Sequence, residues 1–141
     1  MLALGISVAA LDTIHDYHAG DGDGALSFFY GELADLGMFG ALAGAAMLLR
    51  NKPEYHKRLV ILGSLGLLGA AFGRITEIAA YYPYLFVGLI ASVFAYDLAS
   101  RRALHPATLV GAALLLLVNF TEVPIGDSGI WIATAHKMFG V

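Results

Sequence analysis

Acidic and histidine side chains recur at intervals of three residues in several segments of the chain, beginning with the stretch "HDYH". Residues three apart lie on the same face of an α-helix. Carboxylates and imidazoles that project from facing helices can bind a divalent transition metal. A metal site is therefore one hypothesis, although "HDYH" supplies no defined third ligand and no ExxH motif occurs. The candidate metal ligands are His15, His18, Glu32, Asp35, Glu77 and Glu122.

Arg74, inside an apolar segment, supports a structural interpretation of the same cluster. An unpaired charge in hydrocarbon costs at least about 2.5 to 3.5 kcal/mol, so Arg74 is expected to face inward and to form an ion pair. Its candidate partners are Glu77, three residues later, and Asp35 or Glu32 on the preceding helix. Together with Glu122, these acids outnumber the arginine, so some of them must be protonated, hydrated or bound to a cation. A proton relay is the third interpretation.

A second polar cluster is expected where three predicted helices begin or end, at His56, Asp97 and His105. Two histidines at similar depth could hold a b-type haem, with His56 and His105 as the axial ligands. The alternative is structural: Asp97 pairs with Arg58 or Arg101, and the histidines cap helix ends.

The composition decides what surrounds these residues. Of the 141 residues, 59% are hydrophobic and 13% are charged, and the mean hydropathy is +0.75, which is typical of a membrane protein. A helix needs roughly 20 apolar residues to cross a hydrocarbon core about 30 Å thick. The predicted spanning helices cover residues 26–49, 58–80, 83–100 and 106–121.

The two ends of the chain are apolar as well, but their runs are too short to span. Residues 1–11 are expected to form a short N-terminal helix. Residues 128–141 contain Trp131 and Lys137 and suit a helix that lies at the membrane interface. The predicted fold is therefore all-α: a single transmembrane helical domain of residues 1–141, with four spanning helices, a short N-terminal helix and a C-terminal interfacial helix.

Basic residues indicate the orientation of this bundle. Six of the eight Lys and Arg residues lie in two connections of the predicted bundle, which alternation of the helices places on one side. Because cytoplasmic loops are enriched in basic residues, these connections are predicted to be cytoplasmic and the protein to lie in an inner (plasma) membrane. The six residues are Arg50, Lys52, Lys57, Arg58, Arg101 and Arg102.

Glycines follow one another at short intervals along the first two predicted spans, including Gly37, Gly44, Gly63 and Gly66. Small residues let helix backbones approach closely in a membrane. We expect these glycines to pack neighbouring helices of the same chain, rather than to form a dimerisation face or a bed for a flat cofactor.

The stretches "RNKPEYHKRLVILGSLGLLGAAFGRI" and "YDLASRRALHPATLVGAALLL", with a late tryptophan, resemble a family of uncharacterised bacterial polytopic integral membrane proteins. The resemblance extends over about residues 26–141 and implies a helical fold and a topology, but no reaction. The matching positions are His56, Lys57, Arg58, Arg74, Tyr96, Asp97, His105, Pro106 and Trp131.

No phosphate loop, Rossmann turn or nucleophile motif occurs, and the chain has no cysteine. The net charge of −3 and the absence of a basic stripe argue against nucleic acid as a partner. We therefore expect a non-catalytic accessory subunit of an energy-converting, respiratory or photosynthetic membrane complex. Its partners would be the lipid bilayer and other membrane subunits or further copies of the chain. The alternative is a redox or transport protein that binds a divalent transition metal, or haem b, in the membrane.

Overall fold

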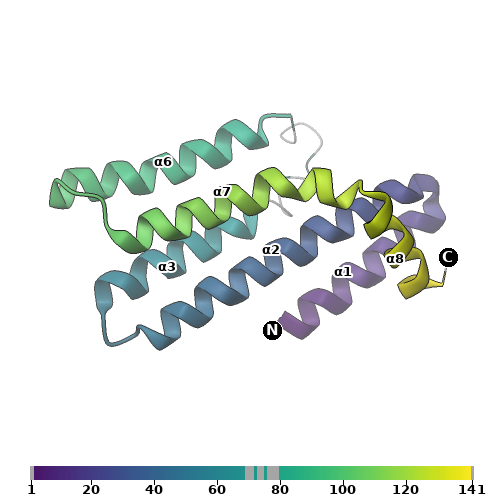
Figure 1. Ribbon diagram of the computed structural model, residues 1–141, viewed down its shortest axis with the longest axis horizontal. Coiled ribbons are helices and arrows are strands. Elements are labelled where there is room, and N and C mark those ends of the chain that lie inside the picture. The colour runs from purple at the N-terminus through teal and green to yellow at the C-terminus, as the bar shows by residue number, and fades with distance from the viewer. Residues whose placement is uncertain (1, 69–71, 73–74, 76–79, 141) are drawn as a thin grey trace. The chain divides into compact units, whose positions relative to one another are not determined.

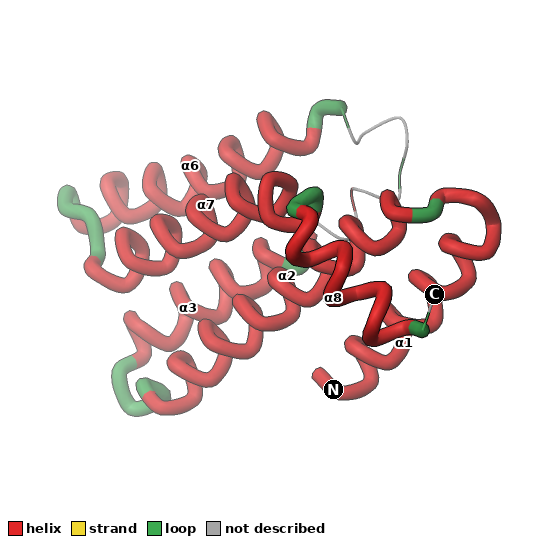
Figure 2. The backbone as a smooth tube through the Cα atoms, turned by 45° about the vertical axis from the view of Figure 1, so that its right-hand side comes forward, coloured by secondary structure: helices red, strands yellow, loops and turns green. Residues whose placement is uncertain are grey.

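The computed structural model describes residues 2–68, 72, 75 and 80–140 (Figure 1). Within these residues the regular structure is entirely helical, without strands, as Figure 2 shows, and this confirms the predicted all-α class. The elements are α1 (Leu2–Asp16), a π-helical turn (Tyr17–Asp21), α2 (Asp23–Leu48), α3 (Pro53–Gly66), α6 (Tyr82–Arg101), α7 (Pro106–Gly126) and α8 (Gly129–Phe139).

Three of these helices are long and apolar enough to cross a membrane: α2, α6 and α7. They correspond to the predicted spans 26–49, 83–100 and 106–121. The remaining predicted span, 58–80, begins within α3. Residues 69–71, 73–74 and 76–79 lie outside the described part of the chain, so a fourth spanning helix stays a prediction.

The helix ends differ from the sequence predictions at two prolines, which lie outside the predicted spans 58–80 and 106–121 and therefore in the predicted connections. Pro53 was expected in a connection but occupies the first turn of α3, where its missing N–H costs no hydrogen bond. Pro124 was also expected in a connection, whereas α7 continues past it to Gly126. In addition, α1 extends through polar residues to Asp16. Its 15 residues make about 22 Å of helix, which is still short of a membrane's hydrocarbon core.

The chain divides into two compact units. The first unit contains Met1–Leu36 and Leu117–Val141, and the second contains Gly37–Leu116. The first unit therefore holds α1, the start of α2, the end of α7, and α8. The second holds the rest of α2, α3, α6 and the start of α7.

The second unit has an apolar core to which four helices contribute. In Figures 1 and 2, α6 runs alongside α7 within this unit. The core side chains interlock closely: Gly111 on α7 faces Leu62 on α3, and a Cβ at this glycine would lie 2.6 Å from Leu62 Cδ1. The buried core residues are Leu42, Ala46, Leu59, Leu62, Phe86, Ile90, Ala107, Ala112 and Leu115.

The first unit is built around the contact of α8 with the start of α2. The indole Nε1 of Trp131 donates a hydrogen bond of 2.8 Å to the carbonyl oxygen of Leu26. Phe29, which is buried, lies against the rings of Trp131 and Phe139. Ser128 caps α8 by accepting a hydrogen bond from the backbone N–H of Trp131.

Polar contacts add to this aromatic packing. His136 Nε2 lies 2.9 Å from Asp23 Oδ1. The hydroxyl of Ser27 donates a hydrogen bond of 2.5 Å to Asp127 Oδ1. Residues of α8 and of the turn before it are thus bonded to the first turns of α2.

Candidate functional site

A buried ion pair joins α3 to α6 in the second unit. Arg58 Nη2 lies 2.6 Å from Asp97 Oδ1, and Arg58 Nε donates a hydrogen bond of 2.8 Å to the same oxygen. Arg58 is 5% exposed and Asp97 is fully buried, at 0%. A charge-assisted pair of this geometry is among the strongest polar contacts in proteins. Asp97 thus binds one of the two arginines that the sequence proposed as partners.

The second carboxylate oxygen of Asp97 also accepts hydrogen bonds. Asp97 Oδ2 accepts a hydrogen bond of 2.5 Å from the hydroxyl of Thr108 and one of 3.2 Å from the backbone N–H of His105. The Thr108 side chain is buried. One carboxylate therefore links α3, α6 and the start of α7, with donors to both of its oxygens.

Glu54 extends the network toward the surface. Its Oε2 accepts a hydrogen bond of 2.7 Å from Arg58 Nη1 and lies 3.5 Å from Arg101 Nη2. The hydrogen bond from Arg58, followed by the charge of Arg101, holds the pKa of Glu54 below its usual value. Arg101, the other proposed partner of Asp97, is thus paired with Glu54.

His105 caps the helix that it precedes. Its Nδ1 accepts a hydrogen bond of 3.1 Å from the backbone N–H of Ala107, and its ring packs edge-on against Tyr55 at 4.5 Å. Burial, reinforced by the charge of Arg58, lowers the pKa of His105. A neutral ring that accepts at Nδ1 carries its proton on Nε2.

His56 has the opposite arrangement. Its Nδ1 lies 2.8 Å from the carbonyl oxygen of Ala46, which can only accept, so Nδ1 carries the proton and Nε2 has the lone pair. A haem axial ligand needs a lone pair on the nitrogen that faces the iron. His56 Nε2 meets this condition and His105 Nε2 does not. These hydrogen bonds give the two neutral imidazoles opposite tautomers, and a haem held by His56 and His105 stays a prediction.

Carboxyl groups from two helices meet in the first unit. Glu32 and Asp35 lie three residues apart on α2. Both side chains are buried, at 5% and 6% exposed. Glu122 on α7 interacts with Asp35, and a Cβ at Gly31 would lie 3.7 Å from Glu122 Oε2. Three of the proposed metal ligands are thus on neighbouring turns, and two of them are in direct contact.

The histidines of "HDYH" do not share this arrangement. His15 Nδ1 lies 3.2 Å from its neighbour Asp16, and His18 Nδ1 lies 2.7 Å from the carbonyl oxygen of Ile14 in its own helix. Both imidazoles are exposed. Arg74 and Glu77 lie outside the described residues, so their predicted pairing is not part of this geometry. Among residues 2–68, 72, 75 and 80–140, no group of three or more His, Asp or Glu side chains is placed to hold a metal ion.

Glu54 and Thr108 are two residues of this network that were not among the candidates from the sequence. A signal for Glu54 was available, because it stands four residues before Arg58, the favourable spacing for an ion pair along one helix. Thr108 has no such signal, since its contact with Asp97 depends on how α6 and α7 are rotated about their axes.

Comparison of the chain with protein families, with curated proteins and with solved structures finds no match. The likeness to uncharacterised polytopic membrane proteins therefore rests only on the residues that carry it.

Proposed function

We propose that the chain is a multi-pass protein of a bacterial inner membrane that serves as a non-catalytic accessory subunit of a larger membrane complex. In this proposal α2, α6 and α7 cross the bilayer, and residues 58–80 supply a fourth crossing. The two loops with most of the basic residues face the cytoplasm.

The observation that carries the proposal is the exposure of large apolar side chains on helices of membrane-spanning length. On α6, Val87 and Leu98 are 46% and 51% exposed, and on α7 Val110 is 60% exposed. Burying such side chains is worth about 1.5 to 3 kcal/mol each. Contact with lipid acyl chains removes this area from water without a change in the fold.

The ends of α6 support the orientation. Tyr81 and Tyr84, at its N-terminal end, are exposed, and tyrosines are enriched where a membrane meets water. At the other end, Arg101 and Arg102 begin the connection to α7, and in Figure 1 this connection and the one between α2 and α3 lie at the same end of the second unit. Basic loops at one end of a bundle favour the cytoplasmic side.

The ion-pair network supports a structural role rather than catalysis. Both oxygens of Asp97 accept hydrogen bonds, from Arg58 on one side and from Thr108 and His105 on the other. A carboxylate bonded in this way cannot accept a further proton or ligand without losing a contact that holds three helices together.

The experiment uses native membranes that contain the chain, with one sample extracted at alkaline pH and another used for purification in a mild detergent. The proposal expects the chain to resist alkaline extraction and to co-purify with defined membrane proteins from its native membrane. Release by alkali would contradict the membrane assignment. A chain that stays in the membrane but purifies without partners would contradict only the accessory role.

A cation-binding protein is the second candidate, and the contact between Asp35 and Glu122 favours it. Glu122 Oε1 is buried and has no hydrogen-bond partner among the described residues. A buried carboxyl oxygen is costly unless a donor or a cation satisfies it. Elemental analysis separates this candidate from the first.

A further inference from the structure

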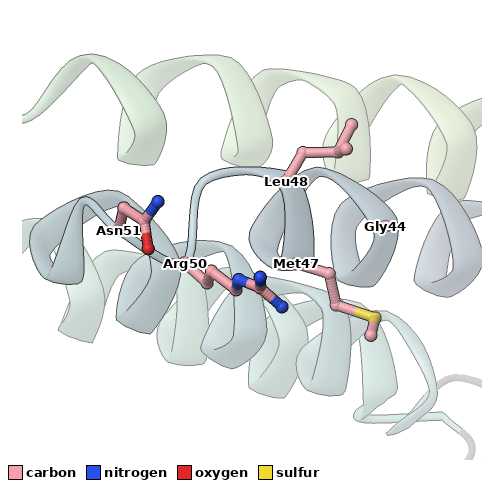
Figure 3. A pocket seen from close by; sticks show the side chains of 5 residues that line it. All are labelled: Gly44, Met47, Leu48, Arg50 and Asn51. Carbon is pink, nitrogen blue, oxygen red and sulfur yellow. The ribbon is translucent and has the colours of Figure 1, made fainter.

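The C-terminal end of α2 carries a hollow that no other described residue of the second unit fills. It is lined by Gly44, Met47 and Leu48 of α2 and by Arg50 and Asn51 of the following turn (Figure 3). Met47 and Leu48 are 70% and 87% exposed. Gly44 makes the space, because a Cβ at this position would meet no atom within 4 Å.

Gly44 therefore departs from the packing role expected from the sequence. Gly63 on α3 fulfils that expectation, since a Cβ there would lie 3.3 Å from Leu42 Cβ. A Cβ at Gly37 would, like one at Gly44, meet nothing within 4 Å. This part of α2 thus offers an apolar surface without a protein neighbour in the described second unit.

The polar edge of the hollow is positively charged. The side chain of Arg50 runs back along α2 toward Met47 (Figure 3), and within the described residues its guanidinium forms no ion pair. The closest acid in the sequence, Glu54, is held by Arg58 and Arg101. Lys52 lies over the ring of Tyr55, 5.7 Å from its centroid. In the described part of the chain Arg50 is therefore a cation without a counter-charge, and it lies next to the Asn51 amide and two exposed apolar side chains.

We propose that this hollow binds an anionic phospholipid, with the phosphate on Arg50 and Asn51 and an acyl chain along Gly44, Met47 and Leu48. The inference rests on the proposed membrane location, which puts the end of α2 at the cytoplasmic edge of the bilayer. Guanidinium is the side-chain group best suited to phosphate. The apolar lining continues from this edge along a candidate spanning helix, as a lipid continues from its headgroup into its chains.

The test compares phosphatidylglycerol with phosphatidylcholine, each added to the detergent-purified full chain, by native mass spectrometry. The wild type should retain phosphatidylglycerol in preference, and excess inorganic phosphate should not displace it, because phosphate alone lacks the acyl contact. Arg50→Gln should weaken retention about fivefold, as expected for one basic residue near an anionic headgroup. Arg102→Gln removes an equally exposed arginine in the other basic loop and should leave retention unchanged.

Gly44→Leu provides a steric test, since it places a larger apolar side chain in the hollow and its Cβ would meet no atom within 4 Å. This variant should lose the lipid, whereas the matched Gly37→Leu on the same helix should keep it. Equal losses from Arg50→Gln and Arg102→Gln, or retention by Gly44→Leu with unchanged helicity, would overturn the site. Failure of the wild type to prefer the anionic lipid would also overturn it, and if the chain still resists alkaline extraction the membrane assignment stands.

Discussion

Arg58 and Asp97 form a buried ion pair of 2.6 Å between α3 and α6, and this contact organises one end of the second unit. The two residues are 39 positions apart in the sequence. Thr108 and the backbone of His105 bind the remaining oxygen of Asp97, so the pair also holds the start of α7.

Removing one member of this pair should strongly destabilise the protein. Arg58→Met leaves the carboxylate of Asp97 buried without its counter-charge, for which we expect a loss of about 3 to 5 kcal/mol in the free energy of unfolding. Adding Asp97→Asn to Arg58→Met removes the stranded charge and should recover part of the loss. Denaturation in mild detergent measures both, with Arg102→Gln as a control that should change little. Additive losses in the double variant would contradict the pairing.

Gly126 should tolerate no side chain. A Cβ there would lie 2.8 Å from Ser27 Oγ and 2.9 Å from the Ser27 carbonyl oxygen, and the carbonyl belongs to the backbone of α2 and cannot turn away. Gly126→Ala should therefore cost about 1 to 3 kcal/mol. The chain has one tryptophan, Trp131, so its fluorescence during unfolding reports on the first unit. Gly129→Ala, where a Cβ meets nothing within 4 Å, is the control. Equal stabilities of the two variants would show that α7 and α2 are not in this close contact.

Stability should fall in mild acid because of His105. Burial lowers the pKa of this residue in the folded state, so below the ordinary histidine pKa of about 6.5 the unfolded chain binds a proton more readily than the folded chain. His105 therefore contributes to the free energy of unfolding above about pH 6.5. This contribution is lost as the pH falls toward the pKa that His105 has in the folded protein. His105→Asn keeps a capping side chain without the titration. Unfolding measured on either side of pH 6 should show a smaller acid loss in this variant than in the wild type, and an equal loss would rule out the assignment.

Metal content distinguishes the two proposed functions. An accessory subunit with a structural carboxyl cluster should contain no stoichiometric transition metal after purification without chelator or a histidine tag. The cation-binding candidate expects about one ion per chain, lost in Glu122→Gln and also lost as the pH falls, because ligands must be deprotonated. Loss of the metal from the His15→Ala/His18→Ala double variant would favour the site with all six candidate ligands. Retention of the metal by this variant would favour a site made by carboxylates alone.

The helices themselves were largely predictable. The hydropathy of the chain placed two spans at residues 26–49 and 83–100, and the structure has Asp23–Leu48 and Tyr82–Arg101. Apolar length alone fixes such elements in a chain with few charges. The continuation of α7 through Pro124 was not predictable in this way, because proline indicates a break and the neighbouring residues decide whether a helix continues.

The polar contacts were predictable only in part. The sequence grouped Asp97 with basic residues at the predicted helix ends, and it grouped Asp35 with Glu122 in one acidic cluster, but such grouping does not determine which side chain meets which. That choice depends on the rotation of each helix about its axis, and helices that are apolar on nearly every face have no sequence pattern that fixes it. The bonds from Thr108 to Asp97 and from Trp131 to the carbonyl of Leu26 could therefore be found only from the fold.

The most direct test of a multi-pass membrane protein with cytoplasmic basic loops is the labelling of single cysteines in intact cells. The chain has no cysteine of its own, so Lys52→Cys, Arg102→Cys and Asp21→Cys each give one reactive site. An impermeant thiol reagent should label Asp21→Cys from outside, and it should reach the other two positions only after the membrane is opened. Labelling of Asp21→Cys and Lys52→Cys from the same side would show that α2 does not cross the membrane and would contradict the account.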